Sequence, residues 1–219
     1  EPRIAELAGR LNHENVTETP CIIHCEKKNE GFKTASKVQY VASGGCFEKE
    51  GQEYTGALKV LKTIFSYDYL WVNVRVTGGA YGCMCSFSRN GYGFFTSYRD
   101  PNLSATLNVY KKAAEYVRNF EAGQRDMTKY IIGTISGIDQ PLEPAALGDR
   151  SFHAYQSGVT VEMIQKERNQ VLDATEETIR SLAGYIETMM DAGTVCAIGN
   201  DRKLEEEKEL FKQVSSLTQ

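Results

Sequence analysis

A change of hydrophobic period at two adjacent glycines, Gly78 and Gly79, constrains the fold most strongly. Before them, apolar side chains recur at helical spacing over residues 70–74, after Asp68, a suitable N-cap. After them, residues 80–88 alternate in the manner of a strand. Glycine adopts positive φ readily and therefore often ends helices. The sequence predicts a helix that turns directly into a strand at this pair.

A β-hairpin follows the turn. Two strand patterns, 80–88 and 92–98, are joined by Arg89-Asn90-Gly91. An Asn-Gly pair between alternating segments is the strongest short-range hairpin signal, because both residues tolerate positive φ. We therefore expect an antiparallel pair of strands next to the diglycine turn.

The turn should bring Arg75, in the last helical turn, close to Tyr81 at the start of the strand. Arginine is a permanently charged planar donor, and a phenol O–H can donate to an oxyanion. Such a pair suits the polarisation of a carbonyl group or the binding of a peptide backbone. From spacing alone a structural role is favoured over a functional one, because the helix dipole favours a C-terminal arginine and tyrosine is common in strands.

The remaining patterns predict an α+β domain: a mainly antiparallel sheet with helices packed on one face. Residues 1–19 are expected to be a linker or an N-terminal helix, and residues 20–219 a single domain. The predicted strands are 21–26, 35–42 (ended by Ser43-Gly44-Gly45) and 194–198. The predicted helices are 54–66, 144–156, 160–172 and 175–191, with others beginning at Asn102, Asp126 and Asp201 and with Thr160 and Thr175 as caps.

Composition excludes several classes of function. The 219 residues include 41% hydrophobic ones, enough for a normal core. A net charge of -4 without a cationic run argues against nucleic acid or an anionic membrane as partner. No apolar run approaches the roughly 18 to 20 residues of a membrane helix. Because the first residue is Glu1, we expect a segment of a longer polypeptide.

The six cysteines do not form a recognisable metal site. Cys21, His24 and Cys25 are the only His/Cys cluster, and no Cys-x-x-Cys occurs. Cys83 and Cys85 would share one face of a strand, which is poor geometry for a disulfide. The sequence favours reduced thiols and no metal bound by this chain.

Arg-x-x-Gly-Gly-Ala-Tyr-Gly at 75–82, with the hairpin end Ser-Tyr-Arg-Asp-Pro-Asn at 97–102, resembles the last quarter of the pitrilysin-type zinc peptidases. The branch it most resembles is the presequence proteases, relatives of insulin-degrading enzyme. The agreement runs from about residue 37 to the Thr-x-Glu-x-Ile pattern at Thr160. The resemblance implies four similar α+β domains that close on a peptide like a clamshell, this chain being the fourth.

The resemblance also implies what the chain contributes. The family's zinc lies in the first domain, on an inverted His-x-x-Glu-His helix. The three histidines here lack that spacing, so we expect zinc only in an N-terminal domain of the same polypeptide and no activity of the isolated chain. Tyr81 matches the tyrosine that binds the scissile carbonyl of an unstructured peptide. Arg75 matches the arginine that holds the substrate backbone, and Gly78, Gly79 and Gly82 complete the predicted substrate-binding set.

Two alternatives remain open at this point. Some members of the superfamily are non-catalytic subunits that hold substrate for a partner, and a free-standing α+β domain could carry the turn by coincidence. An active form is favoured because Arg75 and Tyr81 are both present. The sequence contains no targeting signal, so the expected location is the cytoplasm or an organelle matrix.

Overall fold

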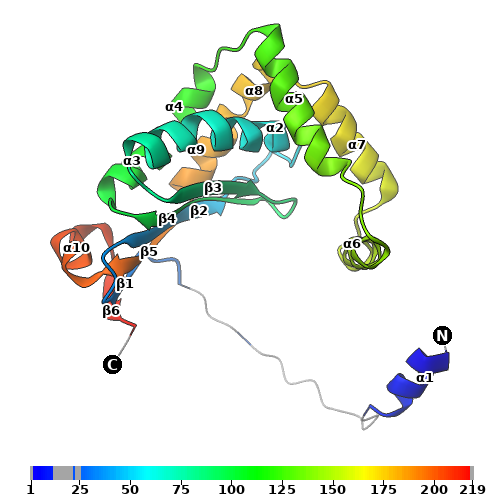
Figure 1. Cartoon of the computed structure of the whole chain (residues 1–219), viewed down its shortest axis with the longest axis horizontal. Coiled ribbons are helices and arrows are strands. Elements are labelled where there is room, and N and C mark those ends of the chain that lie inside the picture. The colour runs from blue at the N-terminus through cyan, green and yellow to red at the C-terminus, as the bar shows by residue number, and fades with distance from the viewer. Residues whose placement is uncertain (1, 12–21, 23–25, 218–219) are drawn as a thin grey trace.

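A computed structural model describes residues 2–11, 22 and 26–217 of the chain. Its centre is a six-stranded sheet in the order β3-β4-β2-β5-β1-β6. Helices α2, α3 and α9 lie across one face of this sheet (Figure 1). The strands are β1 Glu30–Thr34, β2 Gln39–Cys46, β3 Gly82–Phe87, β4 Tyr92–Asp100, β5 Thr194–Asn200 and β6 Gln213–Ser216.

Three of the five strand pairs are antiparallel: β3 with β4, β4 with β2, and β2 with β5. Strand β1 runs parallel to both β5 and β6. The predicted α+β class, with a mainly antiparallel sheet and helices on one face, is confirmed. The α-helices are α1 Pro2–Gly9, α2 Ala57–Ile64, α3 Ser104–Lys111, α4 Ala113–Arg118, α5 Gln124–Ile138, α6 Pro144–Gln156, α7 Val161–Leu172, α8 Glu176–Ser181, α9 Ala183–Asp191 and α10 Asp201–Glu206.

The core lies between the sheet and the helices. Burial alternates along β2 and β4, so that Val41 and Phe95 face the helices whereas Tyr40 and Phe94 are exposed on the opposite side. The ring of Phe95 stacks on that of Tyr110 from α3, with centroids 5.3 Å apart. One face of the sheet is therefore core and the other is open.

One continuous helical segment leads from α2 to the diglycine turn. Two π-helical stretches, Phe65–Tyr69 and Trp71–Thr77, follow α2 directly, and Leu70 between them has helical dihedral angles. Asp68 is therefore not an N-cap, and the prediction of a new helix there is wrong. Its carboxylate instead accepts a hydrogen bond from the hydroxyl of Tyr130. The wider π turns keep Phe65, Tyr69 and Val74 buried without interrupting the helix.

Strand β2 continues through the glycines that were expected to end it. A Cβ on Gly44 would lie 2.4 Å from the Gly93 carbonyl oxygen, and one on Gly45 would lie 2.6 Å from the Met189 carbonyl oxygen. Glycine is needed at these two positions because neighbouring backbone approaches too closely for a side chain. A special backbone conformation is not the reason. The strand expected at 21–26 falls mainly outside the described residues.

The hairpin is confirmed as β3 and β4, and α6 spans the predicted 144–156. Thr160 and Thr175 cap α7 and α8, each accepting a backbone N–H across 3.2 Å. Asn102 and Asp126 are not caps, because α3 and α5 begin after Leu103 and Gly123. The C-terminal charged helix ends at Glu206, after which a 3-10 turn at Lys208–Leu210 leads into β6, a strand that the sequence did not predict.

Candidate functional site

The diglycine corner joins the helical segment to β3. Gly79 has φ +81°, a conformation that favours glycine. Its N–H donates to the Arg75 carbonyl oxygen across 2.9 Å, and the N–H of Ala80 donates to the Val74 carbonyl oxygen across 3.1 Å. These bonds satisfy carbonyl groups at the helix end, and they hold the start of β3 against the last helical turn.

The segment after β4 stabilises the same corner. The side-chain amide of Asn102 donates to the Gly78 carbonyl oxygen across 2.6 Å. The fully buried carboxylate of Asp100 accepts the backbone N–H of Asn102 at 2.8 Å and the Thr106 hydroxyl at 2.7 Å. The Asp-Pro-Asn segment therefore fixes the corner through hydrogen bonds.

Arg75 is half-buried at the C-terminal end of the helical segment. Its guanidinium lies over the ring of Trp71, 3.9 Å from the ring centroid. The guanidinium is also near Cys83. Burial raises the pKa of the Cys83 thiol, and the positive charge of Arg75 partly opposes that effect. Arg75 is thus held by an aromatic ring beside the first residues of β3.

Tyr81 is 66% exposed at the beginning of β3, the edge strand of the sheet. Its ring meets that of Tyr98 edge-on, with centroids 5.6 Å apart at 70°. Tyr98 in turn contacts Tyr40 at 5.4 Å on the open face. Among the described residues, no side chain or backbone group hydrogen-bonds the Tyr81 hydroxyl. The phenol is therefore available to a ligand.

The corner brings Arg75 and Tyr81 onto adjoining elements, as expected, but their side chains have different partners. Arg75 packs on Trp71, whereas Tyr81 packs on Tyr98. The three glycines of the predicted set also differ. Gly79 needs its positive φ, a Cβ on Gly78 would lie 2.6 Å from the Val74 carbonyl oxygen, and a Cβ on Gly82 would have no atom closer than 4.0 Å.

Sequence reasoning missed Arg99. This residue has φ +48°, and its guanidinium lies 5.8 Å from the ring centroid of Tyr81 and 5.5 Å from that of Tyr98. Arg99 belongs to the hairpin-end motif, so its presence could be read from the sequence. Its contact with Tyr81 could not be, because strand alternation predicts that Tyr98 and Arg99 point to opposite faces.

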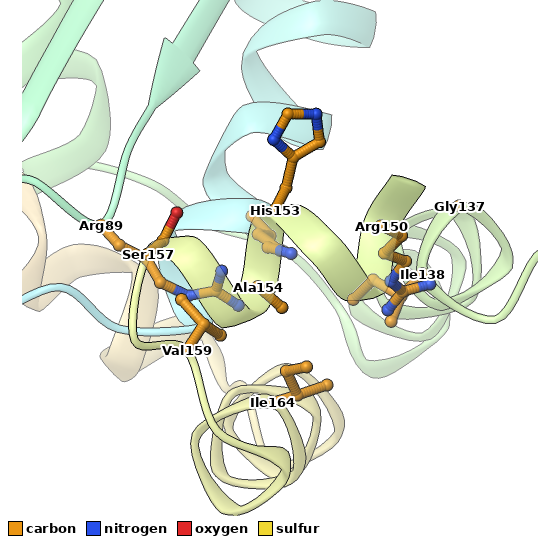
Figure 2. A pocket seen from close by; sticks show the side chains of 10 residues that line it. Arg89, Gly137, Ile138, Arg150, His153, Ala154, Ser157, Val159 and Ile164 are labelled. Atoms are coloured by element: carbon orange, nitrogen blue, oxygen red, sulfur yellow. The ribbon is translucent and has the colours of Figure 1, made fainter. Parts of the chain in front are cut away.

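Several hollows lie away from the corner, and two of them bear on the open face and on the basic residues. One, of about 440 Å³, is on the open face, where Gly44, Gly45 and Gly93 leave space beside Tyr92 and Phe94. The other, of about 380 Å³, is enclosed by α5, α6 and α7 and is lined in part by Arg150, His153 and Ile164 (Figure 2).

Basic residues surround the second hollow, but a buried carboxylate compensates two of them. Lys59 and Arg89 both line it, and both form ion pairs with Glu167, which is only 6% exposed. The imidazole of His153 points away from Ile164 on the opposite wall (Figure 2). This cluster links α2 and α7 to the β3–β4 turn, so we assign it a structural role.

The described part of the chain offers no cluster of three or more His, Cys, Asp or Glu side chains that could hold a metal ion. Cys21, His24 and Cys25, like His13, lie outside the described residues. Cys46, Cys83, Cys85 and Cys196 are free thiols. Burial raises the pKa of Cys85 to about 12, so this thiol is a poor nucleophile and metal ligand.

The fold and the corner agree with a known domain. The family model described as the PreP C-terminal domain matches residues 29–201. The chain belongs to this family. Its corner and sheet are therefore to be compared with those of other PreP C-terminal domains.

Two relatives illustrate the similarity. The chain is 41% identical over 215 residues to "Protein HypA" of Clostridium perfringens, which covers 98% of the chain and 22% of that protein. It is 35% identical over 174 residues to "Presequence protease 1, chloroplastic/mitochondrial" of Arabidopsis thaliana, covering 79% of the chain and 16% of that protein. The chain therefore spans about a fifth of the length of these relatives.

Solved structures with the same fold include pitrilysin, with a TM-score of 0.61 at 12% identity over 90% of this chain and 22% of that one. A second is the "peptidase M16 inactive domain" from Pseudomonas fluorescens, with a TM-score of 0.60 at 14% identity over 83% and 47%. These structures show that the chain has a pitrilysin-like fold. Within the described residues, no helix combines the length and the apolar character needed to cross a lipid bilayer.

Proposed function

We propose that the chain is the C-terminal domain of a zinc metalloendopeptidase that degrades unstructured peptides inside a closed chamber. Residues 20–219 would be the fourth of four similar domains. Membership of the PreP family and the small share of each relative that the chain covers support this proposal. The zinc ion and the general base that activates water would belong to an N-terminal domain of the same polypeptide.

Tyr81 would donate its phenolic O–H to the scissile carbonyl oxygen as negative charge develops there, and Arg75 would hold the substrate backbone beside it. One observation carries this assignment: an exposed tyrosine hydroxyl on a corner that Gly79, Asn102 and Asp100 hold rigidly. An oxyanion donor stabilises the transition state only if it is fixed before the reaction. Gly82, beside Tyr98, would leave room for the peptide backbone.

The open face of the sheet supports a role in contacting peptide. Large apolar side chains are exposed there on three strands: Tyr40 on β2, Met84 on β3, and Tyr92 and Phe94 on β4. A contiguous exposed apolar surface commonly marks a binding site. In the proposed enzyme this face would form part of the chamber wall.

Steady-state kinetics of the complete enzyme on an unstructured peptide tests the assignment. Tyr81→Phe should lower kcat by about a hundredfold to a thousandfold with a smaller effect on KM, because one oxyanion donor is lost. Arg75→Ala should impair both constants. Tyr155→Phe, at a still more exposed tyrosine on α6, is the control and should retain the wild-type rate. Wild-type rates for both site variants would rule out the assignment.

A substrate-holding domain without a catalytic role is the second candidate. It is favoured by the similarity in fold to M16 peptidase domains that are described as inactive. In that case Tyr81→Phe and Arg75→Ala would raise KM and leave kcat unchanged. A mixture of this chain with the separately made N-terminal portion should show zinc-dependent peptide hydrolysis if the first proposal holds.

We place the parent protein in the cytoplasm or an organelle matrix, because the described cysteines are free thiols.

A further inference from the structure

A β-bulge interrupts β4 beside Tyr81. Gln39 of β2 pairs with Asp100 of β4, but Val41 pairs with Ser97. Two steps along β2 thus correspond to three along β4, so β4 contains one extra residue in the stretch from Tyr98 to Arg99. Bulges bend a strand locally and redirect side chains.

The bulge explains why two successive residues of β4 reach the same ring. In a regular strand, Tyr98 and Arg99 would point to opposite faces. Here the Tyr98 ring meets the edge of the Tyr81 ring, and the Arg99 guanidinium lies over Tyr81 and Tyr98, 5.8 Å and 5.5 Å from their centroids. The Tyr81 N–H also donates to both carbonyl oxygens, of Tyr98 at 3.1 Å and of Arg99 at 3.3 Å.

The backbone of Arg99 is strained in this arrangement. It is the only non-glycine residue with positive φ in the described part of the chain. A glycine would adopt the same conformation without a steric penalty from Cβ. A strained non-glycine residue persists where its surroundings hold it in place, and such residues cluster at functional sites.

We propose that Arg99 is a positioning residue for Tyr81. The bulge directs its guanidinium over the exposed phenol ring, and this ring contacts both the cation and the ring of Tyr98. An exposed tyrosine would otherwise rotate about its side-chain bonds, whereas catalysis needs the donor within a narrow range of position and angle. This inference rests on the proposed function, in which the Tyr81 hydroxyl binds the scissile carbonyl.

The test uses three substitutions at residue 99 in the complete enzyme. Arg99→Gly removes the cation together with the backbone strain, so the fold should be as stable as wild type or more so in thermal unfolding. Its kcat should nevertheless fall about tenfold to a hundredfold with little change in KM, because the donor is misplaced. Arg99→Asn, which tolerates positive φ without charge, should behave similarly. Arg99→Lys keeps a cation within reach of the rings and should restore most of kcat.

A double-mutant cycle separates positioning from an independent role. If Arg99 acts through Tyr81, Tyr81→Phe combined with Arg99→Gly should be no slower than Tyr81→Phe alone. Fully additive losses would overturn the inference, as would a wild-type kcat for Arg99→Gly. If Arg99→Gly keeps the wild-type kcat while Tyr81→Phe lowers it, only this inference fails. If Tyr81→Phe also keeps the wild-type kcat, the proposed function fails as well.

Discussion

The side-chain amide of Asn102 lies 2.6 Å from the carbonyl oxygen of Gly78 and donates a hydrogen bond to it. This bond joins the segment that follows β4 to the corner that precedes β3. The two positions are 24 residues apart in the sequence. The corner is therefore held by the far end of the hairpin that it introduces.

Asn102→Ala should destabilise the domain by about 1 kcal/mol, because a half-buried carbonyl loses its partner. Urea unfolding of this chain measures the loss. The exposed Asn119 at the end of α4 provides the control, since Asn119→Ala removes the same group from a site without a comparable bond. Equal stability of the two variants would show that the Gly78 bond contributes nothing. Asn102→Asp should destabilise the domain more than Asn102→Ala, because its carboxylate would face the Gly78 carbonyl oxygen and repel it.

Gly79→Ala should destabilise the chain by about 1–2 kcal/mol for conformational reasons alone. The added Cβ has room, since its nearest neighbour, the Pro101 side chain, would be 3.5 Å away, but φ is +81°. Gly82→Ala is the matched comparison, because its Cβ would have no atom closer than 4.0 Å. It should leave thermal unfolding unchanged and lower peptidase activity if a substrate backbone passes over it. A stable Gly79→Ala variant would contradict the conformational explanation.

Trp71 should report on peptide binding. It is the only tryptophan of the chain, is 43% exposed and stacks on Arg75. When a peptide engages the guanidinium, the environment of the indole changes, so its fluorescence should change in a saturable manner. The titration needs no zinc and uses this chain alone. Arg75→Ala should abolish the saturable change, and a persistent change would mean that the peptide binds elsewhere.

Cys85 should be much less reactive than the other described thiols. Burial disfavours its thiolate and raises its pKa to about 12 from an ordinary value of 9.0. Because the thiolate is the nucleophile, alkylation at pH 8 should modify the half-buried Cys46, Cys83 and Cys196 before Cys85, which should react only on unfolding. Peptide mapping after timed alkylation gives the order of modification.

The same burial makes stability depend on pH. The thiol of Cys85 ionises at a lower pH in the unfolded state than in the folded state, so the stabilisation from keeping it neutral is complete below about pH 9 and is lost between pH 9 and 12.

Local patterns were sufficient for the elements whose signals lie within a few residues. The Asn-Gly turn predicted the hairpin, the caps at Thr160 and Thr175 predicted two helix starts, and the diglycine pair predicted the corner. Each depends on backbone preferences of the residues concerned. The family resemblance on the 75–82 motif was also confirmed, because that segment is specific in sequence.

Tertiary contacts decided the rest. Gly44 and Gly45 look like a strand end, yet they lie inside β2 because neighbouring backbone approaches too closely for a Cβ. Strand β6 forms because β1 offers it a parallel edge, which no local pattern reveals. The sequence alone determined that Arg75 and Tyr81 flank the corner. Only the folded sheet, through a bulge set by pairing across two strands, decided that Arg99 meets Tyr81, because strand register is a property of non-local hydrogen bonds.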